Sequence, residues 1–308
     1  MKLITTQKII SNTSLILDHW NNEFSNTFLL SEELFNIKII NSDYTLINES
    51  FCLFDNEEYI GTIVFKVLDE NLYISIIHVI KDKQFLGYGK LLIKEAYELA
   101  KKNNYKKIFL GSDPECLFSG VFMEGNDEVH RFFSNQGFAR EYLNYNLIAY
   151  TSPETIWLSN DYEIKKADLK RRNELLNFIN DNFSKRWLLE VSNNSINQVY
   201  ILLHKNKIIG FINSALSNNH HYPNSLNLYK LFDNLAGIGP LGIAPIYQSK
   251  GLGKGFVNYV LRDLFQLGAS EVMVDWTGLV DFYKKCGFEK IYKTYIIYSI
   301  KVGSEYEE

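Results

Sequence analysis

The sequence has 308 residues, carries a formal net charge of -4 at pH 7, and contains 46% hydrophobic and 22% charged residues. These proportions are those of an ordinary globular protein, and they exclude a chain that is disordered throughout. Since domains typically hold about 100–200 residues, a chain of this length favours two domains over one. The acidic balance argues against a non-specific nucleic-acid binder, which would carry a basic face.

The cysteines and the hydrophobic runs indicate in which cellular compartment the protein is expected. Cys52, Cys116 and Cys286 are odd in number and far apart, so neither a disulfide framework nor a zinc site is expected. No apolar run approaches the roughly 18 residues of a membrane helix, and the first ten residues lack the apolar core of a signal peptide. We therefore expect a soluble cytoplasmic protein without a metal or a membrane partner.

The sequence contains an internal repeat at about half its length. Segments that read Q-x-x-G-x-G-K begin at Gln84 and again at Gln248, each after a β-rich apolar stretch and before a helical pattern. Segments 131–138 and 281–288 form a second matching pair, which reads F-[FY]-x-x-x-G-F. Two independent matches in the same order indicate a duplicated domain.

Hairpins and offsets predict the domain boundary and two insertions. Segments 51–61 and 199–210 each predict a β-hairpin ahead of the glycine loop. Compared with the first copy, the second has extra residues within 217–234, and we expect this polar stretch to cover the binding site, as long loops often carry function. The first copy has its own insertion within 114–127. We expect domains at 1–152 and 153–308, each an α/β (α+β) mixed sheet in the order strand, helix, hairpin, strand, helix, strand, helix, strand.

The glycine loop is expected to bind a phosphate group. Its spacing excludes both the Walker A loop, G-x-x-x-x-G-K-[ST], and the dinucleotide fingerprint, G-x-G-x-x-G. Glycine lacks Cβ, so backbone N–H groups can approach a ligand closely, and the following helix N-terminus adds unsatisfied donors. The candidate binding residues are Gln84, Phe85, Leu86, Gly87, Tyr88, Gly89 and Lys90 in the first copy, and Gln248, Ser249, Lys250, Gly251, Leu252, Gly253 and Lys254 in the second.

These motifs resemble those of the GCN5-related N-acetyltransferase (GNAT) superfamily, and runs 118–121, 239–243 and 274–279 resemble a bacterial subgroup with two tandem domains. The resemblance covers almost the whole chain. It implies two GNAT-type domains, each with two central parallel strands that splay apart. It also implies acetyl-CoA as the cofactor, with its pyrophosphate on the glycine loop, and an amine as the acceptor. The acceptor class stays open among small amines, amino acids, antibiotics and protein N-termini.

The resemblance also implies where the chemistry lies. A backbone N–H within Leu241, Gly242 and Ile243 would polarise the acetyl carbonyl. Tyr283 matches the general acid of the family, which protonates the departing thiolate. The general base is less defined, because Asp275 follows the central strand but other residues also qualify. The alternatives are Glu190, His220 and His221, and in the first copy His78.

The two domains are expected to be unequal. Tyr283 has Phe133 as its counterpart, and phenylalanine has no proton to donate. We therefore expect catalysis in the C-terminal domain, beside a non-catalytic N-terminal domain that keeps its glycine loop. Two alternatives remain: an acyl-CoA-binding regulatory protein without turnover, and aminoacyl transfer from charged tRNA, against which the acidic balance argues.

Overall fold

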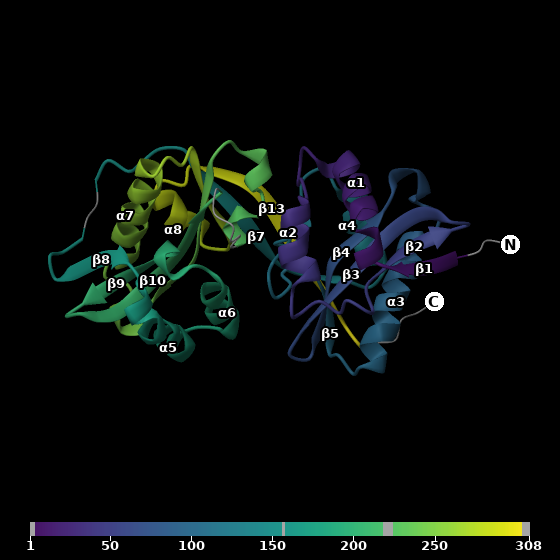
Figure 1. Cartoon of the computed structure of the whole chain (residues 1–308), viewed down its shortest axis with the longest axis horizontal. Coiled ribbons are helices and arrows are strands. Elements are labelled where there is room, and N and C mark those ends of the chain that lie inside the picture. Colours follow the sequence, from purple (N-terminus) through teal and green to yellow (C-terminus); the bar gives the residue numbers. More distant parts are fainter. Residues whose placement is uncertain (1–3, 156–157, 218–223, 304–308) are drawn as a thin grey trace. The chain divides into compact units, whose positions relative to one another are not determined.

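The computed structural model describes residues 4–155, 158–217 and 224–303 (Figure 1). The chain forms two compact units. The first unit comprises the described residues up to Asn144 together with those from Thr294 onward, and the second unit is Tyr145–Lys293. No helix among the described residues is long and apolar enough to cross a membrane.

The first unit is built on a sheet in the order β1, β2, β3, β4, β5, β13. Neighbouring strands are antiparallel except β4 and β5, which run parallel. Its strands are β1 (Ile4–Lys8), β2 (Phe51–Asp55), β3 (Glu58–Leu68), β4 (Asn71–Val79), β5 (Lys107–Leu110), β6 (Val121–Phe122), and parts of β7 (Ala139–Ala149) and β13 (Lys290–Lys301). Its helices are η1 (Ile10–Asn12), α1 (Thr13–Phe24), α2 (Glu32–Phe35), η2 (Asn36–Ile40), η3 (Lys81–Lys83), α3 (Tyr88–Lys102) and α4 (Asp127–Asn135).

The second unit repeats this arrangement, with the order β7, β12, β11, β10, β9, β8 and a parallel pair formed by β11 and β12. Its further strands are β8 (Tyr162–Lys166), β9 (Val199–His204), β10 (Lys207–Leu216), β11 (Leu235–Ile243) and β12 (Glu271–Thr277). Its helices are η4 (Leu169–Arg171), α5 (Arg172–Asn182), α6 (Lys185–Asn193), η5 (Ile196–Gln198), η6 (Asn224–Leu226), η7 (Tyr229–Leu231), η8 (Pro245–Tyr247), α7 (Leu252–Gln266) and α8 (Val280–Lys285).

The predicted hairpins are confirmed, and their turns are alike. Asn56 and Glu57 connect β2 to β3, and Lys205 and Asn206 connect β9 to β10. All four have positive φ angles, between 49° and 69°. Two consecutive left-handed residues make the turn whose twist matches that of the flanking strands. Each hairpin then shifts its register once near the turn, between Leu53 and Phe54 in the first and between Ile208 and Gly210 in the second.

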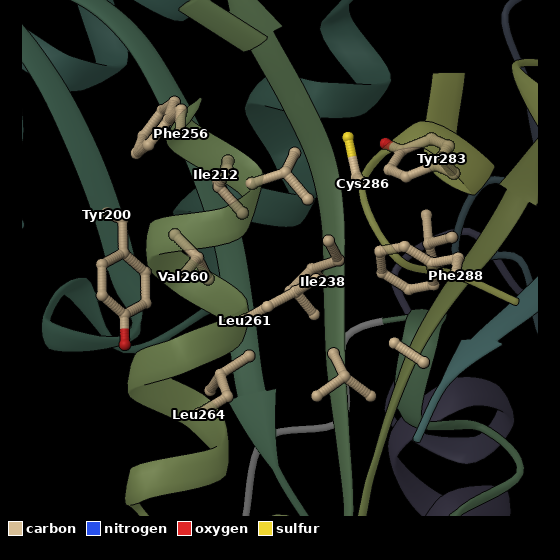
Figure 2. Packing of buried hydrophobic residues seen from close by; sticks show 14 of the residues in the cluster. Tyr200, Ile212, Ile238, Phe256, Val260, Leu261, Leu264, Tyr283, Cys286 and Phe288 are labelled. Carbon is tan, nitrogen blue, oxygen red and sulfur yellow. The ribbon is translucent and has the colours of Figure 1, made fainter. Parts of the chain in front are cut away.

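The helix after each glycine loop is held by its apolar face. Figure 2 shows this for α7, whose side chains face Ile212 and Ile238 on the sheet. The buried residues of this face are Phe256, Val257, Val260, Leu261 and Leu264. In the first unit, α3 buries Leu92, Ile93, Ala96 and Ala100 in the same manner. Burial of each large side chain stabilises this packing by about 1.5–3 kcal/mol, and the packing fixes where the N-terminus of the helix lies.

Each unit is completed by a strand from the other half of the sequence. Residues 298–301 of β13 pair with 107–110 of β5, and β7 pairs with β12 from Ala149 to Tyr145. The compact units therefore differ from the expected domains 1–152 and 153–308, which would separate each sheet from one of its strands. The last strand of each repeat is an apolar run, and such a pattern fits either sheet, so the sequence does not indicate the exchange.

The insertion at 217–234 is partly core rather than a polar surface loop. Ser225 and Leu226 are fully buried. Ser225 lies so close to β11 that a Cβ on Gly237 would come within 2.2 Å of its hydroxyl oxygen. Residues 225–229 are therefore part of the core, and cover of the acceptor site by this segment stays a prediction. His220, His221 and Tyr222 lie outside the described residues.

Candidate functional site

The two parallel strands of each unit pair over four residues and then separate. Pairing between β4 and β5 ends at Ile74 and Leu110, and pairing between β11 and β12 ends at Ile238 and Val274. Immediately beyond, β4 and β11 each carry a register irregularity against their other neighbour. Beyond the split, backbone groups on one edge of each strand have no parallel partner strand.

A glycine loop follows each of these strands, and the two loops share one conformation. Phe85 and Ser249 have φ angles of 59° and 60°, and Gly87 and Gly251 have 90° and 76°. A Cβ at either glycine would meet nothing within 4 Å. Alternation of left- and right-handed residues before a helix turns successive N–H groups toward one point, which makes an anion-binding concavity.

The glutamine of each motif fastens its loop to the strand. Gln84 Nε2 donates to the Val79 carbonyl at 2.9 Å, and Gln248 Nε2 donates to the Ile243 carbonyl at 2.8 Å. These bonds close the turn between strand and helix. The side-chain amide groups of the two glutamines are therefore engaged with the protein.

Several predicted loop residues present only their backbone to a ligand. Tyr88 is buried and its hydroxyl donates to Asp55, and Leu252 belongs to the core of the second unit. Among the lysines near the loops, Lys83 forms an ion pair with Glu58 at 2.6 Å, and Lys250 lies over the ring of Tyr247. At Tyr88 and Leu252, only the main-chain groups are therefore available to contact a cofactor.

A cavity of about 390 Å³ adjoins the glycine loop of the first unit. This volume lies in the range of small-molecule sites. Gly87, Gly89 and Lys90 form its loop end. Its other lining residues are Phe24, Ile77, His78, Val79, Gln84, Phe85, Glu128, Val129, Phe132 and Phe133. The first unit thus has a formed, mostly apolar pocket beside a phosphate-type loop.

His78 lines this cavity and is paired with Glu23, whose side chain is 19% exposed. Nε2 of His78 lies 3.2 Å from Glu23 Oε1, and that carboxylate oxygen also accepts from the Lys81 backbone N–H at 2.9 Å. Burial lowers the pKa of His78, while the carboxylate of Glu23 opposes this shift. Sequence reasoning singled out His78 by its distance from Gln84, but Glu23 lies 55 positions away on α1 and gave no signal.

In the second unit, Tyr283 occupies the position that Phe133 holds in the first. It lies on α8, is 5% exposed, and its hydroxyl points toward Cys286 (Figure 2). Burial raises the pKa of Tyr283, and the charges of Cys286 and Asp275 add to this effect. The hydroxyl therefore stays protonated over the physiological range.

Asp275 and the strand segment predicted to hold the acetyl group belong to the same separation of strands. Asp275 follows Val274 on β12, where parallel pairing has ended, and a Cβ on Gly239 would lie 3.7 Å from its Oδ1. Gly242 is covered on β11 by aromatic rings, since a Cβ there would come within 2.5 Å of Phe211. Glu190, the other described candidate of this unit, lies on α6.

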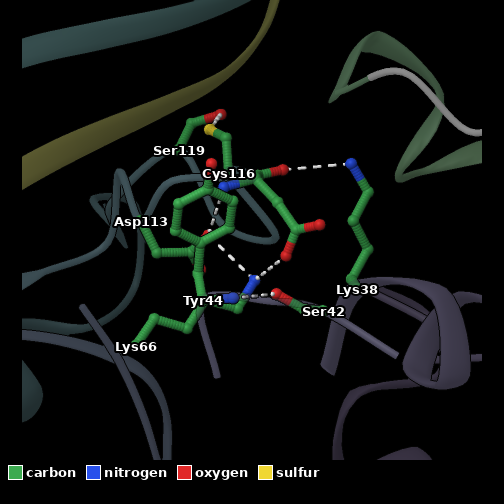
Figure 3. Close-up of polar contacts among 8 residues, drawn as sticks. Lys38, Ser42, Tyr44, Lys66, Asp113, Cys116 and Ser119 are labelled. Carbon is green, nitrogen blue, oxygen red and sulfur yellow. Dashed lines mark hydrogen bonds and ion pairs between the residues drawn. The ribbon is translucent and has the colours of Figure 1, made fainter. Parts of the chain in front are cut away.

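A separate polar cluster stands at the end of β5 (Figure 3). Lys66 is completely buried and forms ion pairs with Asp113 at 3.2 Å and Glu115 at 2.9 Å. Lys38 donates to the Glu115 carbonyl at 3.0 Å. These bonds fix the loop after β5, so we assign this cluster to structure. Over the residues described, no group of three His, Cys, Asp or Glu residues could hold a metal ion.

The comparisons with known proteins agree with this geometry. A family model described as the acetyltransferase (GNAT) family matches residues 16–138 and 159–288. Among curated proteins, none is significantly similar in sequence. The two matched segments coincide with the two repeats, which confirms the tandem arrangement and the mixed α/β fold.

Three solved structures illustrate the fold. The GCN5-related glucosamine N-acetyltransferase region of a fungal multi-domain GH3 β-N-acetylglucosaminidase aligns with a TM-score of 0.86 and 21% identity, over 97% of this chain and only 38% of that one. A GCN5-related N-acetyltransferase from Sphaerobacter thermophilus aligns with a TM-score of 0.72 and 10% identity, over 97% and 96%. A tandem GNAT protein from the clavulanic acid biosynthesis pathway aligns with a TM-score of 0.65 and 12% identity, over 98% and 100%.

Proposed function

This chain belongs to the GNAT family of acetyltransferases, and on that premise we propose that it transfers an acetyl group from acetyl-CoA to the amine of an acceptor. The observation that carries the proposal is the duplicated geometry of splayed strand, left-handed glycine loop and helix. The open space at Gly87 and Gly251 supports phosphate binding there, because a ligand can reach the main-chain N–H groups without displacing a side chain.

We assign catalysis to the second unit. Acetyl-CoA supplies an acyl group activated as a thioester. A backbone N–H within Leu241, Gly242 and Ile243 is assigned to polarise its carbonyl, since stabilising the developing oxyanion is often the largest catalytic contribution. Asp275 is assigned to accept the proton of the acceptor amine, because a lysine-type amine with a pKa near 10.4 is almost entirely charged at pH 7.

Tyr283 is assigned to the leaving thiolate. Thiols of the cysteine type have a pKa near 8.5, below the raised pKa of Tyr283, so complete proton transfer from the hydroxyl is uphill. We therefore propose that Tyr283 stabilises the departing sulfur by donating a hydrogen bond, and that solvent completes the protonation. Phe133 provides no such donor in the first unit.

The acceptor is proposed only as a class. A small amine, an amino acid, an antibiotic or a protein N-terminus fits the chemistry, and glucosamine is added because of the fungal region named above. The three cysteines are buried thiols, which supports a reducing cytoplasmic setting.

Release of CoA thiol from acetyl-CoA tests the proposal against the alternative of a binding protein without turnover. Glucosamine, free amino acids, an aminoglycoside and short peptides with free N-termini serve as acceptors, and mass spectrometry identifies the acetylated product. We expect thiol release that depends on one of these amines. Acetyl-CoA binding without release for any of them would contradict the enzyme and favour the regulatory alternative.

A further inference from the structure

The cavity of the first unit opens toward both faces of β4. Ile77 and Val79 point to the face covered by α3, where Phe133 also lines the cavity, whereas His78 points to the face covered by α1, together with Phe24. A thioester would reach the separation of β4 and β5 from the glycine loop, on the face covered by α3. His78 would then approach this thioester from the other face, which is covered by α1. The cavity is thus lined by side chains from both faces of the strand.

His78 is buried, and neither of its ring nitrogens makes a hydrogen bond. The residue is 4% exposed, and its ring is in edge-type contact with Trp20 and Phe24. Its Nε2 lies at an ion-pair distance of 3.2 Å from Glu23 Oε1, and within residues 4–155, 158–217 and 224–303 neither Nε2 nor Nδ1 has a hydrogen-bond partner. A buried ring nitrogen without a partner costs free energy unless a ligand supplies one.

We propose that the first unit is a second acyl-transfer site, in which His78 is the catalytic base for an acceptor amine and Glu23 is its positioning residue. The proposal rests on the proposed function, because it takes the same acyl-CoA donor and the same class of acceptor. The reaction assigned to the first unit is slow, because position 133 is a phenylalanine and not a tyrosine, but it does not require the tyrosine.

The surroundings of His78 suit a base. Its lowered pKa leaves the imidazole neutral at pH 7, and therefore able to take up a proton. The charged and titratable groups around it are Glu23 and His19 from α1, Tyr59 from β3, Lys90 from α3 and Glu128 from α4. The carboxylate of Glu23 stabilises the imidazolium that forms, as in other oriented base pairs.

The step balances without a further reactant. The acceptor ammonium gives one proton to His78 and becomes a neutral amine. Its nitrogen then forms a bond to the acyl carbon, the carbon–sulfur bond breaks, and the electron pair leaves with sulfur. The second amine proton passes through water to the thiolate, and the imidazolium returns its proton to solvent. The products are the amide and CoA thiol.

The missing donor predicts a slow site. General acid–base assistance is worth roughly 10²–10⁴-fold, so transfer in the first unit is expected to be slower than in the second by a factor of this order. In the wild-type chain the second unit would hide this rate. The test therefore starts from Gly251→Asp, in which a left-handed position still suits the side chain while its carboxylate repels the phosphate of the second loop.

The first measurement is thiol release by the Gly251→Asp chain with the acceptor that the wild-type chain uses. We expect a residual rate that falls at least tenfold when His78→Gln is added and that also disappears with Gly87→Asp. His204→Gln is the matched control, because His204 is a half-buried histidine bonded to Tyr247 in the second unit; it should leave the residual rate unchanged. Thermal melts establish that each variant is folded.

The pH profile separates a base from a structural histidine. The residual rate should fall as pH falls through the pKa of His78, below 6.5, because protonation removes the base. Glu23→Gln should move this limb to still lower pH, since the carboxylate that favours the imidazolium is gone. A purely structural role for Glu23 would change the rate without moving the limb.

A binding measurement gives a readout independent of turnover. In NMR spectra of the Gly251→Asp chain, acetyl-CoA should shift the ring signals of His78, which are assigned by their loss in His78→Gln. Gly87→Asp should abolish this shift. An unshifted His78, or a residual rate insensitive to His78→Gln, overturns the inference. If the wild-type chain itself acetylates no amine, the proposed function fails, and this inference fails with it.

Discussion

Phe133 and Tyr283 occupy the same position in the two units. The carbonyl of Phe133 accepts the N–H of Phe138 at 3.1 Å, and the carbonyl of Tyr283 accepts the N–H of Phe288 at 3.1 Å. Both residues are about 95% buried at the end of the helix that follows the separated strands. The two sites thus differ by one hydroxyl group at an otherwise equivalent place, which makes a reciprocal substitution possible.

Tyr283→Phe should lower kcat by roughly 10²-fold or more while acetyl-CoA affinity changes little. The hydroxyl stabilises charge that develops only as the thiolate leaves, so its loss affects the transition state rather than binding. Steady-state kinetics and equilibrium binding of acetyl-CoA check both parts. Phe133→Tyr is the reciprocal variant, and it should not lower kcat, because it adds a donor to the slower first unit and leaves the second unit unchanged. Full activity in Tyr283→Phe would remove the second unit from the proposed chemistry.

Phosphate binding by the glycine loops can be tested with two substitutions that differ in charge but suit the same backbone conformation. Asn and Asp both tolerate the left-handed conformation of Gly251, whose φ is 76°. Gly251→Asp should weaken acetyl-CoA binding at the second unit by roughly 10²-fold more than Gly251→Asn, because hydrogen bonds to charged groups are worth about 1.5–3 kcal/mol and here become repulsion. Calorimetric titration measures the difference. Equal affinity for the two variants would place the phosphate elsewhere.

Inactivating the loop of the first unit should affect the chain less. Gly87→Asp is expected to leave kcat within a few-fold, since the faster chemistry is assigned to the second unit. Its effect on binding should be confined to one equivalent of acetyl-CoA. A chain that keeps full activity with Gly251→Asp and loses it with Gly87→Asp would reverse the division of labour between the units.

Sequence reasoning found what local patterns determine. Glycine spacing located both loops. An apolar strand, a polar turn and a second strand that starts near Gly61 or Gly210 located both hairpins, because turn chemistry and strand propensity act over a few residues. The pairing of His78 with Glu23 depends on packing between α1 and β4, so no local pattern carries it. The buried ammonium of Lys66 was missed for another reason, since a lysine in an apolar strand reads as a solvent-facing position.

Lys66 predicts a large effect on stability. Removing one partner from a fully buried ion pair typically costs about 3–5 kcal/mol, because the remaining carboxylates lose their counter-charge. Lys66→Met should therefore lower the free energy of unfolding of the first unit by this amount in urea titrations. Lys106→Met is the matched control, because its ion pair with Glu70 is largely exposed and should matter by less than about 0.5 kcal/mol. Equal free energies of unfolding for the two variants would show that the buried ion pairs of Lys66 do not stabilise the first unit.

The exchanged strands predict that neither half of the sequence folds well alone. A fragment of residues 1–152 lacks β13, whose Tyr295, Ile296, Ile297 and Tyr298 are at most 4% exposed. Burial of four such side chains contributes roughly 6–12 kcal/mol, which is comparable to the whole stability of a typical domain. The fragment should show no cooperative thermal transition by circular dichroism, and a peptide of residues 290–303 should restore one. A scrambled peptide of the same composition is the control, because it keeps the hydrophobicity but not the register against β5. If fragment 1–152 melts cooperatively without any peptide, at the temperature of the intact chain, then β13 is dispensable to the first unit and the strand exchange does not govern its folding.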